Sequence, residues 1–482
     1  MNKADLAKSR KIIERIVVTG ELVLETPTRF GNGDEEGLID MTLARDSLEG
    51  HALLPGASIA GALRSYLRTR ELGFRTPAAR DALERRLFGI EERRQVNGKQ
   101  EIDSDQSYLI VYDALAKEVA TELRDGVAID PLTRTARHQK KFDLELLAAG
   151  TRFPLRVELL VGAGQEEQLV RALAIALQGF ERGEIPMGAR RRRGFGQCRV
   201  TEWQVKRYPL IRPQGLLAWL TQDQAHPPTV PQKGTAIGKL LNVAATDLDK
   251  RQIFTIEATL GVAGSLLIRS YSEEPGAPDM VHLKSKRNGN HLPIISGTSL
   301  AGALRARALR IANTIGESSK AATFIDDLFG PQIENSDTQP WASRLWAEES
   351  VIEQPLDLVV NRVKIDRFTG GSFPTALFSE QPVFGMKETQ VTLTVHIHNP
   401  TNADKGILLL LLKDLWTQDL PVGGEASVGR GRLQGKYATL VDKQDGRQIE
   451  WELRQEGTKL VINGDRNLLQ TYVDQFWEKV QA

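Results

Sequence analysis

The sequence has one cysteine and no long apolar run, and each absence excludes a class of protein. Cys198 alone cannot form a disulfide framework or a metal site built from several cysteines. The longest apolar run, residues 407–412, is far shorter than a membrane span. The N-terminal segment MNKADLAKSRK has no apolar signal core, so we expect a cytoplasmic protein that is not attached to a membrane.

An excess of charge of one sign is also missing. The 63 Lys and Arg residues nearly balance the 62 Asp and Glu residues, so the formal net charge is +1. Any surface that binds an anion must therefore be local. The length of 482 residues exceeds what one hydrophobic core usually serves, so we expect at least two domains.

Three common catalytic motifs are absent from the sequence. The seven histidines form no H-E-x-x-H pair, and there is neither a G-x-x-x-x-G-K-[ST] loop nor a G-x-S-x-G turn. The sequence therefore does not support a zinc hydrolase, a P-loop ATPase or a serine hydrolase of the common types.

The chain repeats itself once. The segment LPGASIAGALR at residues 54–64 returns as ISGTSLAGALR at residues 295–305, and Leu87-Phe88-Gly89 returns at the same offset as Leu328-Phe329-Gly330. Two Ile-Asp pairs, at 129–130 and 365–366, and two glycine-rich segments, at 188–196 and 423–431, follow in the same order. An ordered set of four landmarks indicates a duplicated domain.

The repeat divides the chain into four parts. We expect a first domain at residues 1–208, a proline-containing linker at 209–249, a second domain at 250–440, and a tail at 441–482 with a hairpin and a helix. Each half reads as strand, long loop, helix, strand, strand, helix, strand. This order predicts an α+β fold of two tandem ferredoxin-like domains (βαββαβ, as in RRM-type RNA-binding proteins), with long loops and projecting hairpins.

The start of the first helix in each half is a candidate phosphate site. Gly56 and Ser58 precede one helix, and Gly297 and Ser299 precede the other. A helix N-terminus after glycine presents free N–H groups and the positive end of the helix dipole. The alternative interpretation is that each serine is a simple N-cap after a turn.

The glycine-rich segments are candidate RNA-binding loops. The first has four arginines between its glycines, followed by an aromatic ring: Arg190, Arg191, Arg192, Arg193 and Phe195. Arginines pair with phosphates, and the ring could stack on a base. The second segment keeps the glycines and Arg430 but loses most of the charge, so the two halves are expected to bind phosphate unequally. The alternative for the charge run is a solvated face.

A third candidate is a basic hairpin in each half. Basic residues before an aromatic-containing hairpin suggest an arm that projects onto nucleic acid. A solvent-exposed hairpin without a ligand explains them equally well. The candidate residues are Arg134, Arg137 and Lys140 in the first half, and Arg362, Lys364 and Arg367 in the second.

Taken together, these segments resemble the RAMP superfamily. Residues 55–64 and 295–305 are similar to its Pro-Gly-Ser-Ser-Leu-x-Gly-x-Leu-Arg signature, which adds Arg64 and Arg305 to the candidates. Residues 364–371 resemble the Ile-Asp-Arg-x-Thr-Gly segment that leads into a thumb hairpin. The resemblance covers nearly all of both halves, and a tandem copy is similar to fused backbone subunits of type III CRISPR complexes.

The resemblance implies a function in antiviral defence. Such subunits line a crRNA, their thumbs interrupt the guide–target duplex, and a loop aspartate cuts the target RNA opposite each interruption. The matching residues are Asp40 and Asp279, with Asp34 and Asp46 as rivals in the first half. The two aspartates would also hold a divalent ion such as magnesium. The expected partners are crRNA, target RNA, other RAMP-type effector subunits and a large signalling subunit.

Two other functions stay open. The chain could be a non-catalytic RNA-binding scaffold of the same kind of complex, with the aspartates as loop caps. It could also be an endoribonuclease that processes the guide precursor. Cleavage of target RNA at two sites one thumb interval apart would favour the first interpretation over both.

Overall fold

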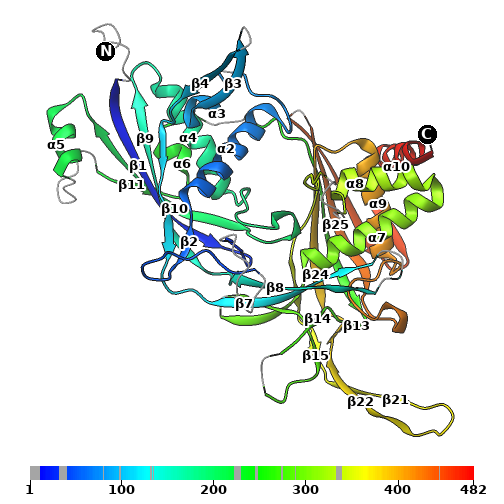
Figure 1. Ribbon diagram of the computed structural model, residues 1–482. Coiled ribbons are helices and arrows are strands. Elements are labelled where there is room, and N and C mark those ends of the chain that lie inside the picture. The colour runs from blue at the N-terminus through cyan, green and yellow to red at the C-terminus, as the bar shows by residue number, and fades with distance from the viewer. Residues whose placement is uncertain are drawn as a thin grey trace.

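The computed structural model describes residues 11–31, 41–79, 81–96, 99–130, 133, 135–221, 230–244, 248–272, 275–287, 289–332, 339–444 and 446–481. Two halves lie side by side, each with a β-sheet and packed helices (Figure 1). Among these residues, no helix is both long enough and apolar enough to span a bilayer.

The sheet of the first half has the strand order β11-β10-β1-β9-β5, with every neighbouring pair antiparallel. Its alternating residues place one apolar face against the helices, as a half-buried sheet requires. The strands are β1 (Ile12–Leu24), β5 (Leu109–Val111), β9 (Arg152–Gly162), β10 (Cys198–Pro209) and β11 (Gln232–Gly234), and the helices are α2 (Gly56–Leu72), α3 (Leu83–Phe88) and α4 (Glu166–Glu181).

The second half repeats this arrangement in a nine-stranded sheet. Its strands β18, β24, β12 and β25 pair in the order that β5, β9, β1 and β10 have in the first half. The predicted duplication is therefore confirmed. The elements are β12 (Ile253–Ala263), β16 (Lys284–Arg287), β17 (Asn290–Ile295), β18 (Leu345–Ala347), β19 (Ser350–Glu353), β24 (Gln390–His398), β25 (Arg432–Gln444), α7 (Gly297–Ile315), α8 (Ser318–Phe329) and α9 (Asn402–Trp416).

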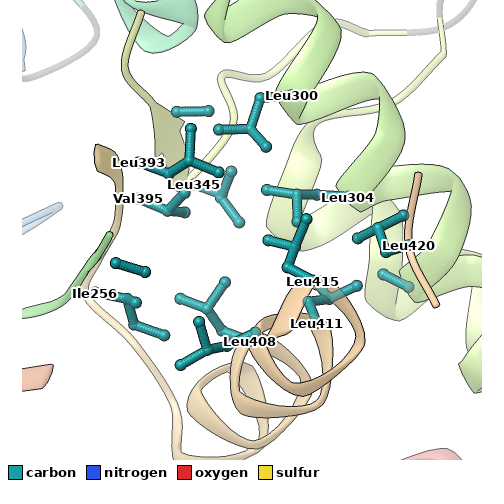
Figure 2. Packing of buried hydrophobic residues seen from close by; sticks show 14 of the residues in the cluster. Ile256, Leu300, Leu304, Leu345, Leu393, Val395, Leu408, Leu411, Leu415 and Leu420 are labelled. Carbon is teal, nitrogen blue, oxygen red and sulfur yellow. The ribbon is translucent and has the colours of Figure 1, made fainter. Parts of the chain in front are cut away.

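The core of the second half lies between its sheet and its helices. Figure 2 shows Ile256 and Leu393 from the sheet facing Leu304 of α7 and Leu408 and Leu411 of α9. The run of apolar residues at 407–412 is thus a buried helix face, as expected. At about 25 cal/mol per Å² of apolar surface, such packing is the main stabilising contribution to each half.

Each half also has a long hairpin. The first hairpin pairs β7 (Thr121–Ile129) with β8 (Ala136–Leu147), and the second pairs β21 (Val360–Ile365) with β22 (Ser372–Gln381). The second hairpin projects away from the body (Figure 1). Short strands complete the loops: β2 (Ala52–Leu54), β3 (Ile90–Val96), β4 (Lys99–Asp105), β6 (Ala114–Ala116), β13 (Ser265–Leu266), β14 (Arg269–Ser270), β15 (Met280–His282), β20 (Leu356–Asp357) and β23 (Val383–Phe384).

The first hairpin reaches across to the second half. The buried Arg124 guanidinium binds the Glu349 carboxylate, and Glu122 Oε2 accepts from the Lys286 N–H at 2.9 Å. Elsewhere the Phe74 ring lies 4.6 Å from the ring of His398. The helical side of the first half therefore packs against the open face of the second sheet.

The two serines expected as N-caps lie inside the helices, so that prediction is wrong. The N-caps are Pro55 and Ser296, and the helices begin at the glycines. A Cβ on Gly56 would lie 2.5 Å from the Val111 carbonyl oxygen. Glycine at position 56 therefore allows the helix to lie close to β5. A serine occupies the N-cap position only in the second half.

The described parts of residues 209–249 pack against the first half instead of forming an extended linker. Strand β11 extends the first sheet, and α6 (Ile237–Leu240) buries Ile237 in the first core. Helix α5 (Pro213–Thr221) places Trp219 over the Arg15 guanidinium at 4.2 Å. The sequence also indicates short helices at residues 216–220 and 237–243, where α5 and α6 lie, but Leu217 and Leu220 of α5 remain exposed.

The tail contains the predicted hairpin and helix. Strands β26 (Arg447–Glu456) and β27 (Lys459–Asn463) extend the edge of the second sheet, and α10 (Arg466–Gln481) packs along α9. The close approach depends on Gly406, where a Cβ would overlap the Tyr472 carbonyl oxygen.

Candidate nucleic-acid interface

The two glycine-rich segments have the same backbone. We call residues 188–196 the first glycine loop and residues 423–431 the second. Each begins and ends with glycines at positive φ, and each contains one left-handed residue, Arg190 (φ 55°) or Glu425 (φ 59°). A short 3-10 turn follows in both, η1 (Arg191–Arg193) and η2 (Ala426–Val428).

The hydrogen bonds that hold these loops are also equivalent. Ala189 donates its N–H to the Arg29 carbonyl at 2.9 Å, and Gly424 donates to Leu267 at 2.8 Å. A Cβ on Gly188 would lie 2.5 Å from that same Arg29 carbonyl oxygen, so the loop can lie this close to the segment after β1 only because residue 188 is glycine.

The first glycine loop, helix α2 and the segment after β1 enclose a pocket. Its volume is about 380 Å³, and we call it the arginine pocket. Its lining combines the small residues of α2 with loop backbone and two guanidinium groups. The lining residues are Arg29, Phe30, Gly31, Pro55, Ser58, Gly61, Ala62, Ser65, Met187, Gly188, Ala189 and Arg191.

Positive charge around the arginine pocket is not neutralised by the part of the chain that the structure describes. No carboxylate there forms an ion pair with Arg29 or with the four loop arginines, and the Nε atoms of Arg29 and Arg192 are buried without a hydrogen-bond partner. Burial, and then the Arg305, Arg190 and Arg192 charges, lower the pKa of Arg193 to about 10. A half-buried cation without a partner carries a desolvation cost, and an anion in the pocket would relieve that cost.

Sequence reasoning missed Arg29. It stands alone after the first strand, outside any charge run, and its neighbour Gly31 is the only local signal. Burial, and then the Arg29 charge, lower the pKa of Arg190, so the two guanidinium groups share one site.

The other side of the first glycine loop touches the second half. A Cβ on Gly297 would overlap the Arg193 carbonyl oxygen, and the Arg192 guanidinium lies 5.5 Å from the centre of the Trp346 ring. The loop therefore lies at the junction of the halves, between the pocket on α2 and the start of α7.

Phe195 cannot stack on a base, so that prediction is wrong. Its ring is 4% exposed and packs against Leu144 and Leu146 at the base of the first hairpin. The Arg124 guanidinium lies 5.3 Å from the ring centre. The glycines on both sides turn this side chain inward.

The arginines of the repeated signature are bound within their own half. Arg64 binds the Glu84 carboxylate and the Gly89 carbonyl, and Arg305 binds Asp326 Oδ1 and the Gly330 carbonyl, both at 2.5 Å. Each arginine thus holds the glycine corner that follows the next helix. Arg64 and Arg305 therefore have a structural role. Their contact with RNA stays a prediction.

The hairpin residues are spread along exposed strands. Lys140 is exposed on β8, Arg137 Nε lies 3.7 Å from Asp130 Oδ2, and Lys364 lies 4.7 Å from the Phe373 ring centre. Arg367 is exposed at the tip of the second hairpin, and Arg134 lies outside the described residues. These cations are far less enclosed than those of the arginine pocket.

Asp279 lies at the base of the second hairpin. Its Oδ2 accepts from the Ser379 N–H at 2.7 Å and from the Ser379 hydroxyl at 3.1 Å. These bonds, the backbone one first, lower the pKa of Asp279, which is therefore ionised and a weak base.

Asp40 and Asp34 lie outside the described residues, but Met41, the residue after Asp40, can be compared with Met280. Met41 forms a parallel bridge to Leu144, and Met280 pairs in parallel with Glu380. In sequence, an aspartate precedes both methionines. The rival Asp46 accepts bonds from the N–H groups of Leu48, Glu49 and His51 and so caps its own turn.

The described residues offer no group of three or more His, Cys, Asp or Glu side chains that could hold a metal ion. Asp279 belongs to no such group, and the described residues do not fit a divalent-ion site by themselves. No catalytic step is assigned to a metal here.

Comparisons with known proteins agree with the repeat. The sequence pattern of the RAMP superfamily matches residues 21–199 and again residues 276–434, which together are more than half of the chain. The CRISPR system Cms endoribonuclease Csm3 of Mycobacterium tuberculosis is 25% identical over 213 residues, which are 40% of this chain and 89% of that protein. The chain belongs to the RAMP superfamily, of which it contains two copies in tandem.

Proposed function

We propose that this chain binds crRNA as a backbone subunit of a type III CRISPR ribonucleoprotein. The observation that carries the proposal is the arginine pocket, where the half-buried Arg29 and the exposed Arg191 lack acidic partners among the described residues. A phosphate would bind there through its charge and the loop backbone, without regard to base sequence. The similarity to Csm3 supports the assignment to a CRISPR system.

The order of strands supports the finer description of the fold. Each half has four antiparallel strands with two helices on one face, in the order expected for a ferredoxin-like βαββαβ domain. In this proposal the partners are target RNA, other RAMP-type subunits and a large signalling subunit, and the complex acts in the cytoplasm.

We further propose that the chain cuts target RNA at two sites. RNA carries its own nucleophile, the 2′-hydroxyl, so the protein need only hold this oxygen in line with the leaving 5′-oxygen. The ionised Asp279 would orient that hydroxyl by accepting its hydrogen bond, and Ser379 fixes the carboxylate against the hairpin. Attack of the 2′-oxygen on phosphorus breaks the bond from phosphorus to the 5′-oxygen, and solvent water takes the hydroxyl proton and protonates that leaving oxygen. The products would be a 2′,3′-cyclic phosphate and a 5′-hydroxyl end, and Asp40 would have the same role in the first half.

Cleavage by the assembled complex tests this proposal. Asp40→Ala and Asp279→Ala should each remove one of two cuts, while Asp46→Ala, which alters only a turn cap, should leave both. Intact target RNA with the wild-type complex would instead favour a non-catalytic scaffold. Cleavage of a guide precursor by the isolated chain would favour the processing function.

The magnesium ion expected from the resemblance is a separate question. Asp40 and Asp279 would be its ligands, but the described residues contain no group of three or more His, Cys, Asp or Glu side chains that could complete such a site. Cleavage measured with and without a chelator would show whether the ion is needed.

A further inference from the structure

The second glycine loop has the shape of the first but the opposite charge at one position. Arg190 and Glu425 occupy the same left-handed position of the two loops. Before the last glycine, Phe195 of the first loop corresponds to Arg430 of the second. Equal backbones with different side chains point to different ligands.

Glu425 belongs to a compact network of charges, which we call the latch. The Arg430 Nη1 atom lies 2.9 Å from Glu380 Oε2 and 2.7 Å from Glu425 Oε2. Arg362 bridges the same two carboxylates at 3.0 and 3.2 Å, and Arg269 binds Glu425 at 3.2 Å. Because the Glu380 side chain is fully buried and Arg430 is 5% exposed, water screens these ion pairs little.

The latch joins the segments that meet at the second site. Arg269 comes from β14, Arg362 from β21 and Glu380 from β22, while Glu425 and Arg430 come from the glycine loop. The residue before Glu380 is Ser379, which binds Asp279. One set of ion pairs thus connects the second hairpin to the second glycine loop, next to the residue that binds Asp279.

The corresponding joint of the first half is apolar. Leu144 and Phe195 are buried together there, with Met41 and Phe142 packed against them. The Arg190 guanidinium lies 4.4 Å from the centre of the Phe142 ring. At this joint the first half therefore uses apolar contacts, and no carboxylate of the described residues pairs with its loop arginines.

We propose that the second glycine loop does not bind RNA phosphate and instead fixes the second hairpin and Asp279. A phosphate brought to Arg430 would meet the charges of Glu380 and Glu425, which already neutralise that arginine. The inference rests on the proposed function, because it states which of two equivalent loops contacts the guide RNA.

The salt dependence of RNA binding separates the two loops. With the full chain and a single-stranded RNA of arbitrary sequence, Arg191→Ala with Arg192→Ala should flatten the plot of log K against log salt, by about 0.7 for each lost contact. Arg362→Ala should leave the slope unchanged, as should the exposed control Arg447→Ala. Equal flattening by Arg362→Ala and by the first-loop variant would overturn the proposal.

Removing the negative charge of Glu425 should change the salt dependence in the opposite direction. Glu425→Gln frees arginines that are now neutralised, so the slope should steepen by about 0.7 for each new phosphate contact. Glu49→Gln, at an exposed acid outside the latch, is the matched control. A slope that does not respond to Glu425→Gln would contradict the neutralisation argument.

Hydrogen exchange without RNA tests the structural role. In Glu425→Gln the amides of β21 and β22 should exchange faster, while those of β7 and β8 should keep their wild-type rates. The conservative variant Glu425→Asp should restore part of the protection. Unchanged exchange in the second hairpin would overturn the latch.

The two kinds of measurement keep the proposals apart. If the wild-type chain binds no RNA, the proposed function fails, and the exchange rates still decide on the latch. If RNA binds but Glu425→Gln changes neither slope nor exchange, only the latch fails.

Discussion

At the scale of single residues, the repeated glycines have two different roles. Gly297 is buried where α7 meets β18 and the first glycine loop, and an added Cβ would overlap backbone atoms of both. Gly302, five residues later, is exposed, and no atom would lie within 4 Å of a Cβ added there. Both glycines belong to the sequence repeat, but the repeat does not show that only Gly297 lies where a larger side chain cannot fit.

Two alanine substitutions in α7 should therefore have opposite effects on stability. Gly297→Ala forces backbone to move in a packed junction and should lower the free energy of unfolding by about 1–3 kcal/mol. Gly302→Ala should raise it by about 0.5–1 kcal/mol, because alanine has less freedom to lose on forming the helix. Denaturant unfolding of both variants checks this pair, and destabilisation by Gly302→Ala would contradict it.

At the scale of elements, the predicted order of strands and helices was the strongest guide. Apart from the short strands, the first hairpin and α3, the order predicted for the first half is found as β1, α2, β5, β9, α4 and β10. Interactions between distant segments were beyond sequence reasoning. The inward turn of Phe195 depends on the first hairpin, and the pairing of β11 with β10 depends on a sheet edge that forms only on folding.

The end of β18 also holds a carboxyl group with a shifted pKa. Burial, and then the Glu257 and Glu25 charges, raise the pKa of Glu348 to about 7, and the His396 Nδ1 atom lies 3.8 Å away. Burial lowers the pKa of His396 to about 4, so this ring is neutral near pH 7. Folded protein thus holds a proton on Glu348 that unfolded protein releases at lower pH.

This shift predicts a pH dependence of stability. A carboxyl pKa raised by folding stabilises the folded state at low pH, and the effect is lost as pH rises through about 7. Between pH 5 and about 7, the free energy of unfolding of the wild type should fall relative to that of Glu348→Gln. Parallel pH curves of the two proteins would show that Glu348 does not carry this shift.

At the scale of the whole molecule, the repeat predicted two domains but not how they contact each other. The first half places its glycine loop, Phe74 and its hairpin on the open face and edge of the second sheet. Arg124 and Glu349 are both buried in this contact, although the sequence gives neither a distinguishing pattern. The arginine pocket itself is lined by the first half alone, and the second half contacts the other side of the first glycine loop.

Loss of the Arg124 side chain should uncouple the halves. The buried carboxylate of Glu349 would lose one of its cationic partners, and breaking such a buried ion pair lowers the free energy of unfolding by about 3–5 kcal/mol. We expect calorimetry of Arg124→Ala to resolve two transitions where the wild type has one. Arg447→Ala, on an exposed strand, should melt as the wild type does. A single unshifted transition for Arg124→Ala would show that this pair does not couple the halves.

The most direct test of the central claim is a structure of the chain bound to crRNA. The account predicts a backbone phosphate in the arginine pocket, within hydrogen-bond distance of Arg29 or Arg191, and no phosphate on Arg430. An empty pocket with the RNA held elsewhere on the chain would contradict the account.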